Sequence, residues 1–178
     1  MKLFWEITFA RVLPGALNLL TIVLIGRYLT VAEYGQFSLV FATITLFVSL
    51  LIGAIEQAIV PLHARQSLNN GKAAFEHQVL GAALCVVGLV GMIVVGPIML
   101  GFAHPGWLLL FAASALSGVF LPILRARLQF WRYGAAATAK AIAALALVAL
   151  FLGDAPDATT AILLYALGVA IGAFVGWG

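Results

Sequence analysis

The sequence predicts an all-α integral membrane protein of six transmembrane helices, with both termini on the cytoplasmic side. Hydrophobic residues make up 65% of the 178 and charged residues only 8%, and the mean hydropathy is +1.17. Such a composition cannot provide the surface of a water-soluble globule of this size. Six apolar runs are each about long enough for a helix to cross roughly 30 Å of hydrocarbon. They are residues 12–29, 36–62, 79–102, 107–124, 134–152 and 161–178, within one domain that covers 1–178.

The distribution of basic residues sets the predicted orientation. With the N-terminus inside, seven of the nine Lys and Arg residues fall on cytoplasmic segments, whereas the outer loops hold Glu33, Asp154 and Asp157. Short loops rich in Lys and Arg stay in the cytoplasm, so this bias favours both ends inside. The seven are Lys2, Arg11, Arg65, Lys72, Arg125, Arg127 and Arg132.

The first two spans are joined by a short outer connection. Pro14-Gly15 stands where the first helix enters the bilayer, and it is interpreted either as a start signal or as a bend in a moving helix. Residues 30–35 end in a glycine and suit a turn between antiparallel helices. The second span is long enough to tilt, and the polar loop 63–78 follows it.

The remaining spans carry their own boundary signals. Gly96-Pro97 predicts a kink in the third span, and Pro122 closes the fourth before a basic, aromatic connection. In the outer turn before the sixth span, Asp157 is a candidate N-cap. The sixth span has glycines four residues apart on one face, a spacing that predicts close packing with a helix of this chain or of another. These are Gly168, Gly172 and Gly176.

The sequence indicates neither an enzyme nor a nucleic-acid-binding protein. No zinc-protease, nucleophile-elbow, Walker or dinucleotide-binding motif occurs, and the three histidines lie far apart. Neither a cofactor nor a metal is expected. The basic residues are divided among separate loops, which suits anchoring to anionic membrane lipids rather than binding to nucleic acid. Ser49, Ser114 and Ser117 are expected to hydrogen-bond back to their own helices.

Polar and charged residues inside the spans are the candidate site. A charge there costs roughly 2.5–3.5 kcal/mol on insertion scales, so it tends to face a partner or a cavity. Glu56 and Lys140 each lie six residues from the cytoplasmic end of a span, about 9 Å deep. They could form a salt bridge with a purely structural role, or they could line a cytoplasm-facing cavity. Arg27 could extend to the outer surface or contact an anion, and Asn18 is the amide of the first span.

Three stretches resemble the polysaccharide exporters, the Wzx-type flippases of the multidrug/oligosaccharidyl-lipid/polysaccharide exporter superfamily. Their order, their spacing and their side of the membrane all match. The first combines Ile25-Gly26-Arg27-Tyr28-Leu29 with Glu33-Tyr34-Gly35. The second combines Ile52-Gly53-Ala54-Ile55-Glu56-Gln57-Ala58 with Ala64-Arg65. The third combines Leu124-Arg125-Ala126-Arg127 with Phe130-Trp131-Arg132-Tyr133.

This resemblance implies one six-helix lobe of a two-lobed transporter in the bacterial cytoplasmic (inner) membrane. The implied substrate is an oligosaccharide on an undecaprenyl pyrophosphate carrier, which is flipped to the outer leaflet by alternating access. Cationic cavity residues would hold the pyrophosphate and sugar acids, with Arg27 the first candidate and Glu56 and Lys140 next. A second lobe would come from a longer chain, a second copy or a separate half.

Two other interpretations share this fold. One is an assembly or scaffold subunit that performs no transport and packs through the glycine face of the sixth span. The other is a small-molecule permease of another class.

Overall fold

The structure is a computed structural model that describes residues 2–66, 88, 106–126 and 130–177. For some of these only the backbone is described, namely residues 2–7, 9, 51–66, 119–120, 122–123, 125–126, 130 and 176–177. The described chain forms helices and no strand, which confirms the all-α class for this part. The helices are α1 (Lys2–Tyr28), α2 (Val31–Gln66), α5 (Gly106–Ala126), α6 (Phe130–Phe151) and α7 (Ala158–Trp177). The predicted span 79–102 with its Gly96-Pro97 kink lies outside the described residues apart from Gly88. Of the predicted loop 63–78, residues 63–66 form the end of α2 instead, and the others lie outside the described residues.

Helix α1 begins ten residues before the predicted span, so the interpretation of Pro14-Gly15 as a start signal is wrong. Proline in a helix interior removes one backbone hydrogen bond, and tertiary packing has to offset the loss. Pro14 is buried. One turn earlier, a methyl group added at Gly134 of α6 would lie 2.9 Å from the Ala10 Cβ. The close approach of α6 therefore supports the part of α1 that precedes Pro14.

The connection between α1 and α2 is shorter than predicted, because α2 begins at Val31 rather than after Gly35. Thr30 is the N-cap residue. The Glu33 backbone N–H donates to Thr30 Oγ1 at 3.4 Å, while the Thr30 N–H and hydroxyl donate to Glu33 Oε2 at 3.0 and 2.7 Å. This reciprocal arrangement is a capping box, which satisfies free donors at the helix start. It turns the expected loop into the first turn of α2.

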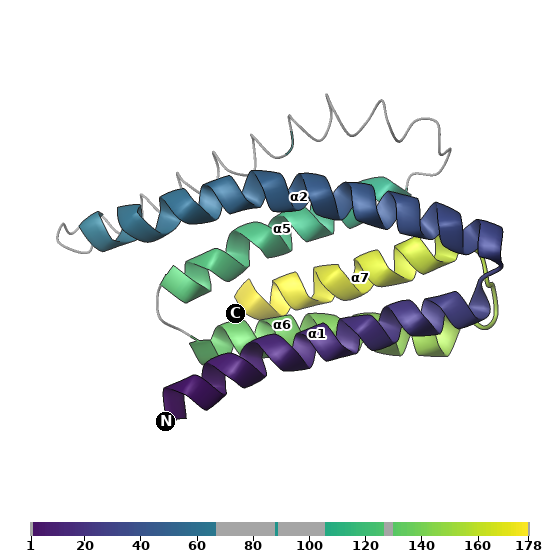
Figure 1. Ribbon diagram of the computed structural model, residues 1–178, viewed down its shortest axis with the longest axis horizontal. Coiled ribbons are helices and arrows are strands. Elements are labelled where there is room, and N and C mark those ends of the chain that lie inside the picture. The colour runs from purple at the N-terminus through teal and green to yellow at the C-terminus, as the bar shows by residue number, and fades with distance from the viewer. Residues whose placement is uncertain (1, 67–87, 89–105, 127–129, 178) are drawn as a thin grey trace.

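Helix α7 is the central element of the bundle. It packs on α5 and on α6, while α1 covers α6 and α2 covers α5. Helices α1 and α6 run in one direction and α2, α5 and α7 in the other, so the two termini lie at the same end (Figure 1). Although α1 and α2 are consecutive, they make few contacts with each other. The bundle therefore consists of two helix pairs, α1 with α6 and α2 with α5, held together by α7.

The glycine face of α7 packs against α6 of the same chain. A methyl group added at Gly168 would overlap the Ala144 backbone and lie 2.7 Å from its Cβ, and one at Gly172 would lie 2.6 Å from the Lys140 Cα. The predicted close packing is confirmed at these two positions, and the structure identifies the partner that the spacing left open. For Gly176 only the backbone course is described, so its packing stays a prediction.

Large apolar side chains cover the outside of the bundle. Leu19 of α1, Leu50 of α2, Leu150 of α6 and Phe174 of α7 are each more than 60% exposed. A soluble protein rarely leaves so much apolar surface in contact with water. Within the described residues, four helices are long and apolar enough to cross a membrane, over Ala10–Tyr28, Val31–Leu50, Trp131–Phe151 and Ala158–Val175. Together these observations indicate a membrane protein whose exposed leucines contact lipid.

Candidate functional site

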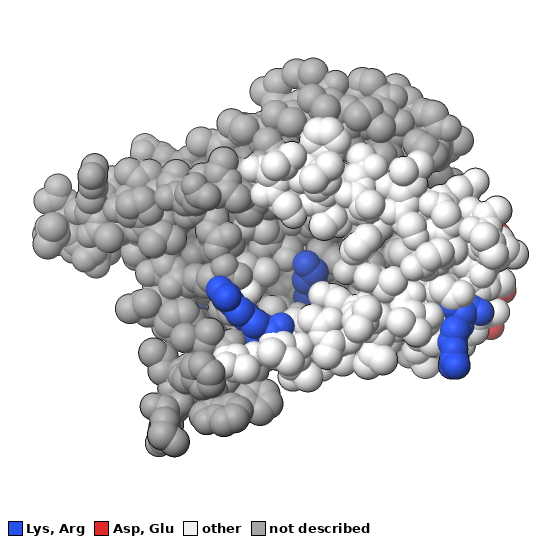
Figure 2. Space-filling view, viewed as in Figure 1, with Lys and Arg blue, Asp and Glu red and all other residues white. Residues whose placement is uncertain are grey.

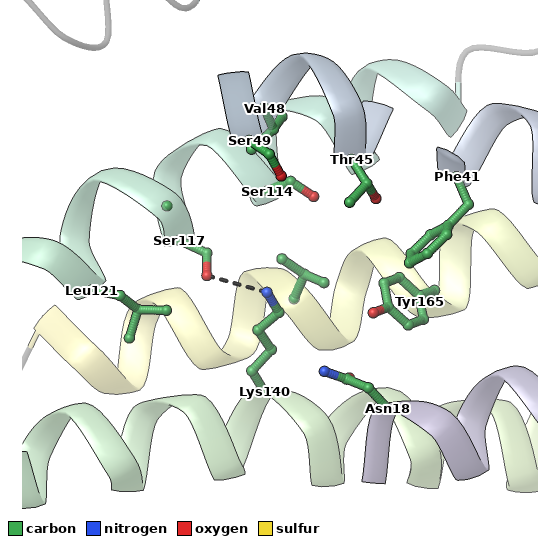
Figure 3. A pocket seen from close by; sticks show the side chains of 12 residues that line it. Asn18, Phe41, Thr45, Val48, Ser49, Ser114, Ser117, Leu121, Lys140 and Tyr165 are labelled. Atoms are coloured by element: carbon green, nitrogen blue, oxygen red, sulfur yellow. Dashed lines mark hydrogen bonds between the residues drawn. The ribbon is translucent and has the colours of Figure 1, made fainter. Parts of the chain in front are cut away.

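A cavity of about 460 Å³, with polar groups on a partly apolar lining, lies between the two helix pairs. All five described helices contribute to its lining: α1 provides Asn18, α6 provides Lys140, and the remaining residues come from α2, α5 and α7. Hydroxyl groups line it from α2, α5 and α7 (Figure 3). They belong to Thr45, Ser49, Ser114, Ser117 and Tyr165. The size falls within the roughly 300–1,000 Å³ of small-ligand pockets.

Lys140 is the only basic residue among the described residues that line the cavity. It lies nine residues after Trp131 and eleven before Phe151 in the candidate span of α6, so it is about 14 Å from the start of that span. This is deeper than the predicted 9 Å, because α6 begins before Gly134. The Lys140 ammonium donates a hydrogen bond to Ser117 Oγ on α5 at 3.4 Å. An ammonium has three donors, so it can also serve a ligand in the cavity.

Asn18 lies at the same level of the bundle as Lys140. It is eight residues after Ala10 and ten before Tyr28 in the candidate span of α1, which runs parallel to α6. Its amide points into the space beside the Lys140 side chain (Figure 3). The Oδ1 atom is buried and accepts no hydrogen bond from the part of the chain that the structure describes. Because almost none of this oxygen is accessible, a ligand in the cavity would meet the amide nitrogen, which is the end of the side chain nearest Lys140 in Figure 3.

Aromatic rings close the cavity towards the end where α1 joins α2. Phe41 and Tyr165 meet edge to face with ring centroids 5.2 Å apart, and Phe41 stacks on Phe37 at 5.7 Å. Beyond this wall the bundle is filled by a hydrophobic cluster that includes Ile25, Leu110 and Leu152. The cavity therefore belongs to the half of the bundle that contains both termini.

Charges differ between the two ends of the bundle. The described acidic side chains, Glu33, Asp154 and Asp157, all lie at the turns between α1 and α2 and between α6 and α7. Figure 2 shows acidic atoms at that edge of the molecule with basic atoms close beside them, and further basic atoms inside a hollow of the displayed face. Arg132 is exposed at the opposite end, in the first turn of α6, but Arg27 in the last turn of α1 lies at the same end as the acidic side chains. The direction of insertion therefore stays a prediction.

The structure brings two of the four predicted site residues together, namely Asn18 and Lys140. Arg27 is exposed in the last turn of α1 and does not line the cavity. The side chain of Glu56 lies outside the described residues, so its predicted pairing with Lys140 remains a prediction.

No known protein family, curated protein or solved structure matches this chain significantly. The arrangement itself therefore indicates which chemistry the cavity suits. Among the described residues that line it, the cavity offers one amino group, several neutral hydroxyl groups and an amide, about midway along two apolar helices. Such a set suits binding of a polar, negatively charged group, because a charge buried at this depth needs a partner.

The hydroxyl groups of the cavity were not predicted as site residues. Thr21 and Thr43 do bond back to carbonyls of their own helices, at 2.9 and 2.8 Å, as was expected of hydroxyls in spans. Ser117 has in addition a partner that was not expected, because its hydroxyl accepts a hydrogen bond from Lys140 on another helix. The spacing of Ser114 and Ser117, three residues apart on one helix face, was the signal that could have indicated a polar stripe.

Proposed function

We propose that this chain is one lobe of an exporter that flips lipid-linked oligosaccharide or polysaccharide precursors across the bacterial cytoplasmic membrane. The observation that carries the proposal is the half-buried Lys140 ammonium in a hydroxyl-lined cavity, midway along an apolar bundle. A charge at that depth is costly and is rarely kept without a function. The three stretches that resemble polysaccharide exporters supply the substrate class, an undecaprenyl pyrophosphate-linked glycan.

The course of the helices supports the proposed six-span topology. Helix α2 ends near the end that holds both termini, while α5 begins at the opposite end (Figure 1). One further crossing, the predicted span 79–102, accounts for this change of end. With six spans and the acidic turns outside, both termini are cytoplasmic.

In this orientation the cavity lies on the cytoplasmic side of the aromatic wall formed by Phe41 and Tyr165. A glycan assembled at the inner leaflet would therefore reach Lys140 before meeting the hydrophobic cluster. The cavity extends between α1 and α2, which diverge beyond their shared turn. We propose that a second six-helix lobe, from a longer chain, a second copy or a separate half, covers this side.

The assembly-subunit alternative loses its proposed contact surface. Gly168 and Gly172 are covered by α6 of the same chain, so they do not offer a helix-packing face to another protein. A small-molecule permease remains as a second candidate, because a cavity of about 460 Å³ also suits a single small polar solute.

The test is export of glycan by cells that produce this protein. Deletion of its gene should cause lipid-linked glycan to accumulate on the cytoplasmic side and should remove the surface polysaccharide. The wild-type gene should restore export, and Lys140→Met should not, at equal protein level. Arg132→Gln is the matched control, since Arg132 is an exposed cation of the same helix outside the cavity. Unchanged surface glycan after deletion would reject the flippase and favour the permease.

A further inference from the structure

The polar atoms of the cavity differ in what each requires from a ligand. Lys140 supplies a single positive charge, and no other basic side chain of the described residues lines the cavity. Asn18 presents its amide nitrogen to the same space, whereas its Oδ1 atom is buried. A complementary ligand therefore has an anionic group for the ammonium and, close to it, a hydroxyl group whose oxygen accepts from the amide N–H.

The number of charges restricts the anion. A carboxylate carries one negative charge, which one ammonium balances. Inorganic phosphate and pyrophosphate carry more at neutral pH, and their excess charge would lie uncompensated in a low-dielectric part of the bundle. Because neutral hydroxyl and amide groups form the rest of the polar lining provided by the described residues, a single negative charge matches this cavity best.

The remaining lining suits a hydroxylated ring. Thr45, Ser49 and Ser114 face the cavity from α2 and α5, opposite Lys140 and Asn18 (Figure 3). Their hydroxyls both donate and accept hydrogen bonds, as sugar hydroxyls do. The Phe41 and Tyr165 rings provide an apolar wall at one end, against which the C–H face of a sugar ring can pack.

We propose that the cavity between Asn18 and Lys140 binds one hydroxylated carboxylate, such as a uronic acid residue of a glycan, rather than the pyrophosphate of the lipid carrier. The inference rests on the proposed function, because it identifies which part of the substrate this site recognises. Lys140 holds the carboxylate, the Asn18 amide N–H donates to a neighbouring sugar hydroxyl, and Ser117 keeps the ammonium directed into the cavity.

The test compares four probes on the purified protein in lipid nanodiscs, by equilibrium binding. Glucuronate has both the charge and the hydroxyls, glucose lacks the charge, acetate lacks the hydroxyls, and inorganic pyrophosphate has excess charge. Glucuronate should bind at least about tenfold more tightly than each of the others, the range expected from losing a charged hydrogen bond. Equal binding of glucose, or tighter binding of pyrophosphate, would overturn the proposal.

Variants locate the binding in this cavity. Lys140→Met should weaken glucuronate binding at least about tenfold, and Lys140→Arg should retain part of it. Asn18→Leu should reduce the preference for glucuronate over acetate. Arg132→Gln is the control and should bind normally, because its side chain is exposed outside the cavity. Normal glucuronate binding by a folded Lys140→Met protein would reject the site, and the four-probe comparison still decides if that variant does not fold.

The two proposals can fail separately. Loss of glycan export on gene deletion, together with no preference for glucuronate, would leave the exporter standing and reject the carboxylate site. Selective binding of glucuronate by a protein whose deletion leaves surface glycan intact would keep the site and reject the exporter.

Discussion

Gly172 of α7 lies directly against the Cα and Cβ atoms of Lys140 on α6, and a methyl group at Gly172 would lie 2.6 Å from that Cα. This contact determines how closely α6 approaches α7 at the level of the cavity. Since the Lys140 stem starts against α7, its side chain extends past that helix to Ser117 on α5. One glycine of the packing face therefore sets the position of the one basic side chain of the described cavity.

Gly172→Ala should destabilise the bundle and also weaken glucuronate binding, because it displaces the Lys140 backbone. Gly168→Ala is the matched control: it overlaps the Ala144 backbone one turn away and does not touch Lys140. Overpacking of this kind typically costs about 1–3 kcal/mol, so thermal unfolding should reveal both changes. If Gly168→Ala weakened binding as much as Gly172→Ala, a specific positioning role for Gly172 would be excluded.

Asp157→Ala should lower the stability of α7 by about 1 kcal/mol, the usual effect of removing an N-cap. The prediction of Asp157 as a cap is confirmed, since its carboxylate accepts hydrogen bonds from the Thr160 N–H at 2.8 Å and the Thr160 hydroxyl at 2.7 Å. Asp154→Ala removes a nearby exposed carboxylate that does not cap the helix. Chemical or thermal unfolding in detergent measures the stability of both variants. An equal loss of stability in the two would indicate that the lost negative charge matters rather than the lost cap.

Single cysteines at Ala32 and Asp154, with Cys85 replaced, should react with an impermeant thiol reagent added to intact cells. Both positions are exposed at the end of the bundle that holds the acidic turns. Cysteines at Asn70 and Gln129 should react only after the membrane is opened, because the basic loops are predicted to be cytoplasmic. The reverse pattern would invert the orientation and place the cavity on the outer side.

A Glu56–Lys140 pair would compete with a ligand carboxylate for the same ammonium, and it predicts that Glu56→Gln or Lys140→Met alone reduces the yield of folded protein more than the two changes together. A lone charge in the bundle keeps its desolvation cost, whereas the double variant removes both charges. Folded yield after size-exclusion chromatography provides the four values of a double-mutant cycle. Additive losses would show that the two side chains do not interact.

Arg27→Gln should leave the protein inserted and abundant but stop glycan export, and Arg27→Lys should retain part of it. Arg27 lies outside the cavity and is exposed in the last turn of α1. The restriction to a singly charged group, which was argued for the buried Lys140 site, therefore does not apply to its guanidinium. A guanidinium can hold a pyrophosphate with two hydrogen bonds, which Lys imitates poorly and Gln not at all. Normal export by Arg27→Gln at matched protein level would assign Arg27 to anchoring at the interface.

Much of the secondary structure could be predicted from the residues alone. The apolar runs located α1, α2, α5, α6 and α7, because twenty or so apolar residues have few other stable arrangements. Helix starts were predicted less well. The Asp157 cap was identified from its sequence position, but the equivalent signal of Thr30 and Glu33 was taken as part of a loop, and α2 begins five residues earlier than expected.

The candidate site, like the secondary structure, could be predicted from the sequence only in part. The sequence by itself determined that Lys140 and Asn18 are costly inside apolar spans and so need partners, because hydrocarbon cannot solvate them. Only the tertiary structure decided that these two residues share one cavity, that Ser117 is a partner of Lys140, and that the glycine face of α7 packs on α6. Such pairings depend on the rotation and crossing of whole helices, which are set by packing among many side chains and have no signature in the spacing along one helix.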